Sequence, residues 1–188
     1  GDLINASRLV FLAGIFDFMD GMFARLLGYY SEIGKQLDSL ADVVSFGVVP
    51  GILVYKLMQK GLAYNPALAG TDYLPYIAFI IPVFSALRLA KFNIDTRQTD
   101  KFIGVPTPAN AMLIASMPLI IESNKFLVSP YFENPHFLII LTFIMSFLLI
   151  SELPLFSMKF KNFNWEENKI SYIFAALSIT LFIILKMT

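Results

Sequence analysis

Cysteine is absent from this chain of 188 residues, and histidine occurs once. The absence of cysteine excludes disulfide bonds, thiolate catalysis and cysteine-ligated zinc or iron–sulfur sites within this sequence. Charge is also scarce, because charged residues make up 15% of the chain, against about 25% in an ordinary soluble domain. Basic and acidic residues balance at 14 each. No net field would recruit a polyanion, so a nucleic-acid partner is not expected.

Apolar side chains are what the sequence has in abundance. Hydrophobic residues make up 57% of the chain, Phe alone occurs 19 times, and the mean hydropathy is +0.68. A domain of this length could not hide so much apolar surface in one modest core. The composition therefore excludes a water-soluble globular enzyme and a disordered tail, and it predicts an integral membrane protein.

The apolar residues form continuous segments that could cross a bilayer. They cover residues 3–29, 36–57, 73–92, 107–121, 137–152 and 170–187. Continuous runs, in contrast to alternating ones, predict helices and not barrel strands. We therefore expect an all-α, polytopic transmembrane helix bundle with about six spans, in a single membrane domain over 1–188. The first residues contain no initiator Met and no basic region, so we also expect a fragment of a longer chain.

The basic residues are distributed unevenly between the two predicted sides of the membrane. If the turn at 29–36 faces the cytoplasm, the connections at 92–106 and 153–169 face it too. That side then holds nine of the 14 basic residues: Arg25, Lys35, Arg88, Lys91, Arg97, Lys101, Lys159, Lys161 and Lys169. The positive-inside rule favours this orientation. We expect a prokaryotic cytoplasmic membrane protein.

Four aspartates lie within or at the ends of the first two apolar segments: Asp17, Asp20, Asp38 and Asp42. One Asp at the centre of a membrane helix costs about 2.5–3.5 kcal/mol, so four cannot face lipid unpaired. The first two share a helix face, because they are three residues apart, and the last two share a face at a spacing of four. A short turn joins the two segments, so we expect these faces to meet.

A cluster of four carboxylates without His or Cys suits Mg²⁺ or Mn²⁺. Two such ions would balance the four charges and still attract a diphosphate. Small residues beside the acidic faces, Gly21, Ala24 and Gly34, leave room for a neighbouring helix or a flat ligand. Arg25 follows directly and can hold a phosphate or pair with an Asp. Structural or proton-relaying carboxylates are the alternative interpretation.

Together these residues form one pattern, Asp17-x2-Asp20-Gly21-x2-Ala24-Arg25-x8-Gly34-x3-Asp38-x3-Asp42. The pattern, at residues 17–42, resembles the signature of the CDP-alcohol phosphotransferases at every fixed position. The resemblance implies a helical membrane enzyme that transfers a phosphatidyl-type group from a CDP-linked lipid to an alcohol and releases CMP. It also implies a homodimer, and the positive-inside orientation places the expected active site toward the cytoplasm. Family members usually have a further helix before the first Asp, so this chain is expected to lack an N-terminal helix.

The resemblance assigns roles by position. Metal ligation is implied for Asp17, Asp20, Asp38 and Asp42. Asp42 would also serve as the catalytic general base toward the acceptor hydroxyl. Nucleotide binding is implied for Asp17, Gly21, Ala24, Arg25 and Gly34. The implied cofactor is a pair of Mg²⁺ or Mn²⁺ ions, and phosphoryl-type transfer indeed needs charge neutralisation and positioning above all.

Two further stretches of the sequence indicate which alcohol accepts the phosphatidyl group. The run from Ser45 to Pro50 and the run from Arg88 to Asn110 resemble the membrane-embedded phosphatidylserine synthases of the same family. The resemblance implies CDP-diacylglycerol as donor and L-serine as acceptor. Candidate acceptor- or phosphate-binding residues are Arg88, Lys91, Asn93, Arg97 and Ser45. The basic residues among them can equally be anchors on the cytoplasmic side of the membrane.

Three other functions are compatible with an acidic cluster in an apolar chain. The same chemistry with glycerol 3-phosphate or an inositol phosphate would require a denser basic pocket beside the motif. An intramembrane aromatic prenyltransferase also uses aspartates and Mg²⁺, but on helices that are not neighbours. An ion-coupled transporter with an acidic relay would favour carboxylates at the bilayer midplane and inverted repeats.

Overall fold

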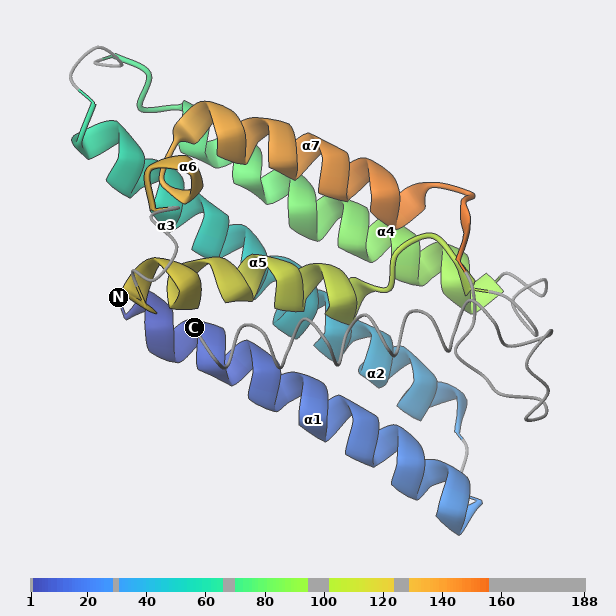
Figure 1. The fold of residues 1–188 in the computed structure, drawn as a ribbon. Coiled ribbons are helices and arrows are strands. Elements are labelled where there is room, and N and C mark those ends of the chain that lie inside the picture. The colour runs from blue at the N-terminus through green and yellow to red at the C-terminus, as the bar shows by residue number, and fades with distance from the viewer. Residues whose placement is uncertain (1, 29–30, 66–69, 95–101, 124–128, 156–188) are drawn as a thin grey trace, which may run out of the picture.

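A computed structural model describes residues 2–28, 31–65, 70–94, 102–123 and 129–155 (Figure 1). These ranges form the helices α1 (Leu3–Leu27), α2 (Glu32–Val43), α3 (Val49–Ala63), α4 (Ile80–Ile94), α5 (Thr107–Ser123), α6 (Ser129–Phe132) and α7 (Pro135–Ile150). A π-helical turn, η1 (Val44–Val48), joins α2 to α3, and a 3-10 helix, η3 (Leu74–Phe79), precedes α4. Two antiparallel strands of two residues each, β1 (Phe102–Ile103) and β2 (Pro154–Leu155), complete the described part.

The helices follow the apolar segments of the sequence. Five of the six predicted segments coincide with helices, and the sixth, 170–187, lies outside the described residues. Two continuous helices are long and apolar enough to cross a membrane, Glu32–Ala63 with 32 residues and Leu74–Ile94 with 21. Large apolar side chains face outward, with Phe18 66% and Leu26 72% exposed. The helical class is confirmed, and the number of six spans stays a prediction.

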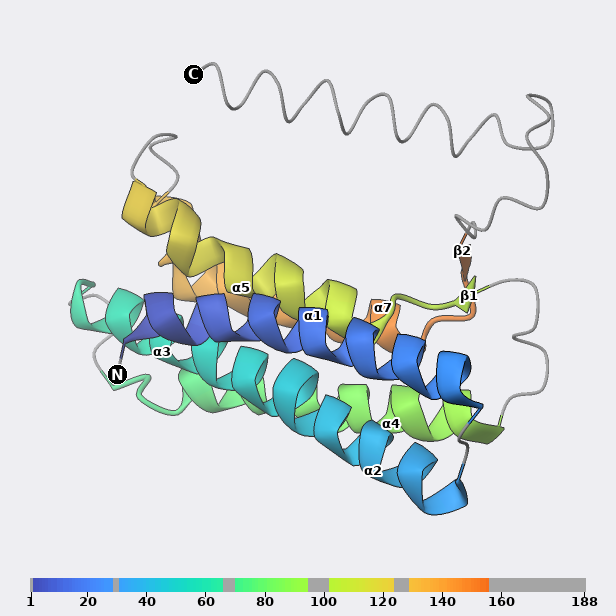
Figure 2. The same ribbon diagram turned by 90° about the horizontal axis from the view of Figure 1, so that it is seen from below.

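The long helices run beside one another in a bundle (Figures 1 and 2). α1 packs against α5, α4 packs against α7, and α3 contacts both of these pairs. The end of α1, the start of α2, the end of α4 and the β1–β2 pair all lie at one end of the bundle. This grouping agrees with the sequence-based assignment of these connections to one side.

The turn between α1 and α2 is defined by caps at both helix ends. Gly28 follows α1 in the left-handed conformation, with φ 66°, which is a common way for a helix to end. Ser31 precedes α2, and its Oγ accepts a hydrogen bond from the Gly34 backbone N–H at 2.9 Å. This N-cap starts the helix at Glu32, four residues before the predicted start at 36. Gly34 therefore lies inside the first turn of α2.

Two glycines let α4 approach the helix that carries the second pair of aspartates. A Cβ atom on Gly47 would lie 3.0 Å from the Ser85 Cβ atom, and one on Gly51 would lie 3.0 Å from Pro82 Cδ. Both distances are tighter than ordinary contacts between side chains. The absence of side chains at these two positions is therefore what allows the close antiparallel packing of α4 on η1 and α3.

The apolar core lies to one side of the acidic residues. Its largest fully buried side chains are Phe46, Leu53, Leu57, Met58, Ile81, Ile114, Leu138 and Leu149. They come from η1, α3, α4, α5 and α7. In contrast, α2 has no buried residue. The part of the chain that carries Asp38 and Asp42 thus projects from the core instead of being enclosed by it.

We expect Gly47→Leu to weaken the bundle, because its side chain would force α4 away from η1. Overpacking of this kind typically costs about 1–3 kcal/mol. The measurement is the midpoint of thermal unfolding of the purified protein in detergent. The matched control is Val44→Leu in the same turn, where the native side chain is 57% exposed. Equal midpoints for the two variants would contradict the role assigned to the close approach.

Candidate metal centre and cavity

Acidic side chains from α1 and α2 meet between the two helices. Asp17, Asp20 and Asp38 each offer a carboxylate oxygen, and these oxygens lie within 4.8 Å of one another. The carboxyl group of Asp42 interacts with those of Asp17 and Asp38. The structure therefore brings together all four aspartates that the sequence pattern selects.

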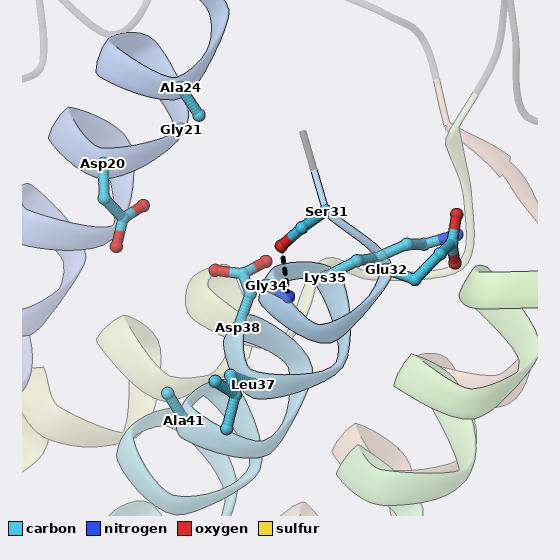
Figure 3. A pocket seen from close by; sticks show the side chains of 10 residues that line it. All are labelled: Asp20, Gly21, Ala24, Ser31, Glu32, Gly34, Lys35, Leu37, Asp38 and Ala41. Carbon is cyan, nitrogen blue, oxygen red and sulfur yellow. Dashed lines mark hydrogen bonds between the residues drawn. The ribbon is translucent and has the colours of Figure 1, made fainter. Parts of the chain in front are cut away.

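A cavity of about 930 Å³ opens beside this cluster (Figure 3). It is lined by Asp20, Gly21, Ala24, Ser31, Glu32, Gly34, Lys35, Leu37, Asp38 and Ala41. Asp20 on α1 and Asp38 on α2 are directed toward the space between the helices. The three small residues of the sequence pattern all lie in the wall. Arg25 belongs to α1, but its side chain lies outside the described part of the structure.

The cavity exists because α1 and α2 diverge although they follow one another in the chain. α2 packs against α4 and has hardly any contact with α1. The residues on the open face of α2 recur at helical spacing, from Gly34 through Leu37 and Asp38 to Ala41. Sequence reasoning missed Leu37 and Ala41 as wall residues, although this periodicity predicts them. It also missed Ser31, Glu32 and Lys35, which line the cavity near the start of α2.

Positive charge near the cluster comes from α4. Arg88 is only 8% exposed, and its charge interacts with that of Asp42. Its guanidinium also lies over the Phe92 ring, 5.1 Å from the ring centroid, a favourable cation–π position. Among the described side chains, no Lys or Arg forms an ion pair with any of the four aspartates. The cluster therefore keeps a negative balance.

The carboxylates fit a divalent ion. Hard oxygen ligands suit Mg²⁺ and Mn²⁺. An ion with ligands at about 2.1 Å holds neighbouring ligand oxygens roughly 3–4 Å apart, so side-chain rotations would bring the oxygens of this cluster into range. Three carboxylates that can hold such an ion are therefore present, next to a cavity large enough for a nucleotide-sized ligand.

The four described residues among the predicted acceptor-binding set, Ser45, Arg88, Lys91 and Asn93, do not line the cavity. Ser45 is half-buried in η1, and Lys91 is exposed on α4. Asn93 donates a hydrogen bond from its side-chain amide to Ser39 Oγ at 2.8 Å. Arg97 lies outside the described residues. Of the four described residues, Arg88 is the one that the structure brings close to the acidic cluster.

We expect Mn²⁺ to stabilise the protein, because an ion bound only by the folded state raises its unfolding free energy. The gain is about 2.7 kcal/mol at a concentration of 100 times the dissociation constant. Asp38→Asn should lose most of this gain, and without metal it should be more stable than the native protein because one repelling charge is gone. Glu32→Gln, at the cavity wall but outside the triad, is the control and should keep the gain. The measurement is thermal unfolding with and without Mn²⁺, and loss of the gain in both variants would argue against a site at the triad.

The sequence of this chain is similar to the sequences of several known proteins. The chain is 36% identical over 151 residues to the CDP-diacylglycerol–serine O-phosphatidyltransferase of Methanocaldococcus jannaschii, covering 80% of this chain and 63% of that protein. It is also 36% identical over 151 residues to the Bacillus subtilis protein of the same name, covering 80% and 74%. An archaetidylserine synthase of Methanothermobacter thermautotrophicus is 38% identical over 121 residues, covering 63% and 48%.

The chain thus spans 63% of the length of the Methanocaldococcus protein and about half of the Methanothermobacter protein. No solved structure matches it. The family model described as CDP-alcohol phosphatidyltransferase matches residues 1–150, which include all four aspartates and every described residue of the cavity wall. This protein therefore belongs to the CDP-alcohol phosphatidyltransferase family.

Proposed function

We propose that this protein transfers the phosphatidyl group of CDP-diacylglycerol to L-serine and forms phosphatidylserine and CMP. The observation that carries the proposal is the acidic cluster, with three carboxylate oxygens within 4.8 Å, beside a cavity lined by small residues. The names of the Methanocaldococcus and Bacillus relatives support the choice of serine. The stretches around Ser45 and Arg88 support the same acceptor.

The aspartates would hold Mg²⁺ or Mn²⁺, as two ions in our proposal, and such ions supply charge neutralisation of the diphosphate and of the departing CMP. The small side chains of Gly21, Ala24 and Gly34 leave the helix backbones accessible, which gives room for the cytidine nucleotide. Arg25 would lie next to the diphosphate. These assignments rest on the sequence pattern together with the position of the small residues in the cavity wall.

The reaction needs one proton acceptor. The serine hydroxyl oxygen attacks the phosphorus that bears the diacylglycerol, the bond from that phosphorus to the CMP oxygen breaks, and the hydroxyl proton passes to Asp42. Asp42 suits this role because its carboxyl group adjoins Asp17 and Asp38 without being part of the closest triad. Arg88 beside it would bind the serine carboxylate. Similar roles for Lys91, Asn93, Arg97 and Ser45 remain sequence-based predictions.

The proposed surroundings follow from the same resemblance. The partners would be the lipid bilayer and a second copy of the chain, and the cavity would open toward the cytoplasm of a prokaryotic cell. The two long apolar helices support membrane association. One relative is named archaetidylserine synthase, which favours testing an ether-linked donor lipid beside the diacyl one.

Release of CMP from CDP-diacylglycerol should depend on L-serine and on Mg²⁺ or Mn²⁺. The experiment supplies the purified protein with diacyl or ether-linked CDP-lipid and a panel of acceptors that includes glycerol 3-phosphate and inositol phosphate. The reason for expecting serine is that Arg88 is the one buried cation near the cluster among the described side chains, since a phosphorylated acceptor would need more positive charge. CMP release that requires glycerol 3-phosphate and ignores serine would contradict the proposed acceptor.

Asp42→Asn should lower kcat by about 10²–10⁴-fold, the usual contribution of a positioned general base, while CDP-lipid still binds. Asp17→Asn is the comparison, because loss of a ligand in the closest triad should weaken binding of the nucleotide as well. The measurements are turnover and equilibrium binding of CDP-diacylglycerol in the presence of Mn²⁺. Equal loss of binding in both variants would show that Asp42 has no separate base role.

A further inference from the structure

Side chains of α2 and α4 form a closed ring of hydrogen bonds at the end of the bundle that carries the cavity. Lys35 Nζ donates to the Asn93 backbone carbonyl at 3.2 Å. The Asn93 side-chain amide donates to Ser39 Oγ at 2.8 Å, and Ser39 Oγ donates in turn to the Lys35 carbonyl at 3.2 Å. We call this ring of Lys35, Ser39 and Asn93 the α2–α4 clasp.

The clasp lies at the C-terminal end of α4, where backbone carbonyl groups need hydrogen-bond donors from outside the helix. Asn93 lies in the last turn of α4, where carbonyl groups have no partner within the helix and attract cations. The ammonium group of Lys35 satisfies this carbonyl. In Figure 3, the Lys35 side chain extends away from the carboxylates of Asp20 and Asp38. Lys35 thus ties α2 to α4 on the side away from the metal cluster.

The cavity wall depends on this attachment because α2 contributes no side chain to the buried core. No residue of α2 is buried, and α2 has hardly any contact with α1. The clasp joins α2 to α4 through two hydrogen bonds, one from Lys35 Nζ to the Asn93 carbonyl and one from the Asn93 amide to Ser39 Oγ. At its other end α2 continues into the π-helical turn η1, a geometry that is frequent at functional sites.

A small rotation of α2 about η1 would be enough to disturb the cluster. Asp38 is six residues from the start of η1, which corresponds to about 9 Å of helix at ~1.5 Å per residue. A tilt of about 10° would therefore move Asp38 by about 1.5 Å, whereas metal sites tolerate deviations of about 0.2 Å. The hydrogen bonds of the clasp involve Lys35 and Ser39, and these two residues lie on either side of Asp38 along α2.

We propose that Asn93 and Ser39 are positioning residues, which fix α2 against α4 and so set the distance of Asp38 from Asp17 and Asp20. This role rests on the proposed metal site, and it differs from the direct acceptor contact that the sequence suggested for Asn93. In this proposal the clasp sets the positions of the carboxylates and does not contact the substrate. Loss of the clasp should therefore change both the separation of α1 from α2 and the affinity for a divalent ion.

The first test measures the separation of α1 and α2 directly. The chain has no cysteine, so Phe23→Cys on α1 and Leu40→Cys on α2 accept spin labels at two sites only. Both native side chains are exposed, at 48% and 63%, and neither lines the cavity. Pulsed electron resonance on the full chain should give a distance distribution that broadens or shifts when Asn93→Ala or Ser39→Ala is added. An unchanged distribution in both variants overturns the proposal.

The second test measures binding of Mn²⁺ alone, from the resonance signal of the free ion, without substrate. The affinity should fall about 10–100-fold in Asn93→Ala and in Ser39→Ala, the range seen for residues that orient metal ligands. The double variant should show no more than the larger of the two losses, because both residues act through one hydrogen bond. Native affinity in both single variants, or losses that multiply in the double variant, overturns the proposal.

Two controls separate positioning from general loss of stability. Ser116→Ala removes a hydroxyl that donates to the Leu113 carbonyl of its own helix, and it should leave the label distances and the Mn²⁺ affinity unchanged. Asn134→Ala removes the N-cap of α7 and should lower thermal stability without changing either quantity. If Asn134→Ala changes both quantities as strongly as Asn93→Ala, the proposed specific role is wrong. If the label distances respond but the native protein binds no Mn²⁺, the metal site fails while the attachment of α2 stands.

Discussion

The mutual repulsion of four carboxylates between α1 and α2 determines how the surrounding helices are arranged. Buried or lipid-facing, such a cluster would be strongly unfavourable without cations. The structure places it instead at a cavity between α1 and α2, with three of the carboxylate oxygens within 4.8 Å of one another. Arg88 reaches toward the cluster from α4, beside Asp42. The remaining negative charge is what makes the site suited to divalent ions and, through them, to a diphosphate.

α4 supports this site through its contacts with α2, η1 and α3. Its first two turns pack closely on Gly47 and Gly51, the following turn presents Arg88, and the last turn holds α2 through Asn93. These contacts run in order along one antiparallel helix pair. A single helix therefore supplies close packing, charge compensation and attachment for the helix that carries Asp38. The divergence of α1 and α2 is possible because α4 takes over the support of α2.

Much of this arrangement could be predicted from the sequence, because it depends on local periodicity. The spacing of the aspartates placed them on two faces, and the structure brings those faces together between α1 and α2. The π-helical turn η1 was not predicted, since its residues continue an ordinary apolar run. The Ser39–Asn93 bond joins residues 54 positions apart, and no local pattern signals it. The start of α2 was misplaced because the polar first turn, capped by Ser31, does not look like a membrane span.

The most direct measurement is anomalous X-ray scattering from crystals of the full chain grown with Mn²⁺ and CDP-diacylglycerol. In the proposed reaction, carboxylates from two consecutive helices hold metal for the diphosphate of a CDP-linked lipid. We therefore expect manganese peaks among the carboxylates of Asp17, Asp20 and Asp38, next to diphosphate density in the cavity. Manganese found elsewhere, with the nucleotide bound away from these three side chains, would contradict it.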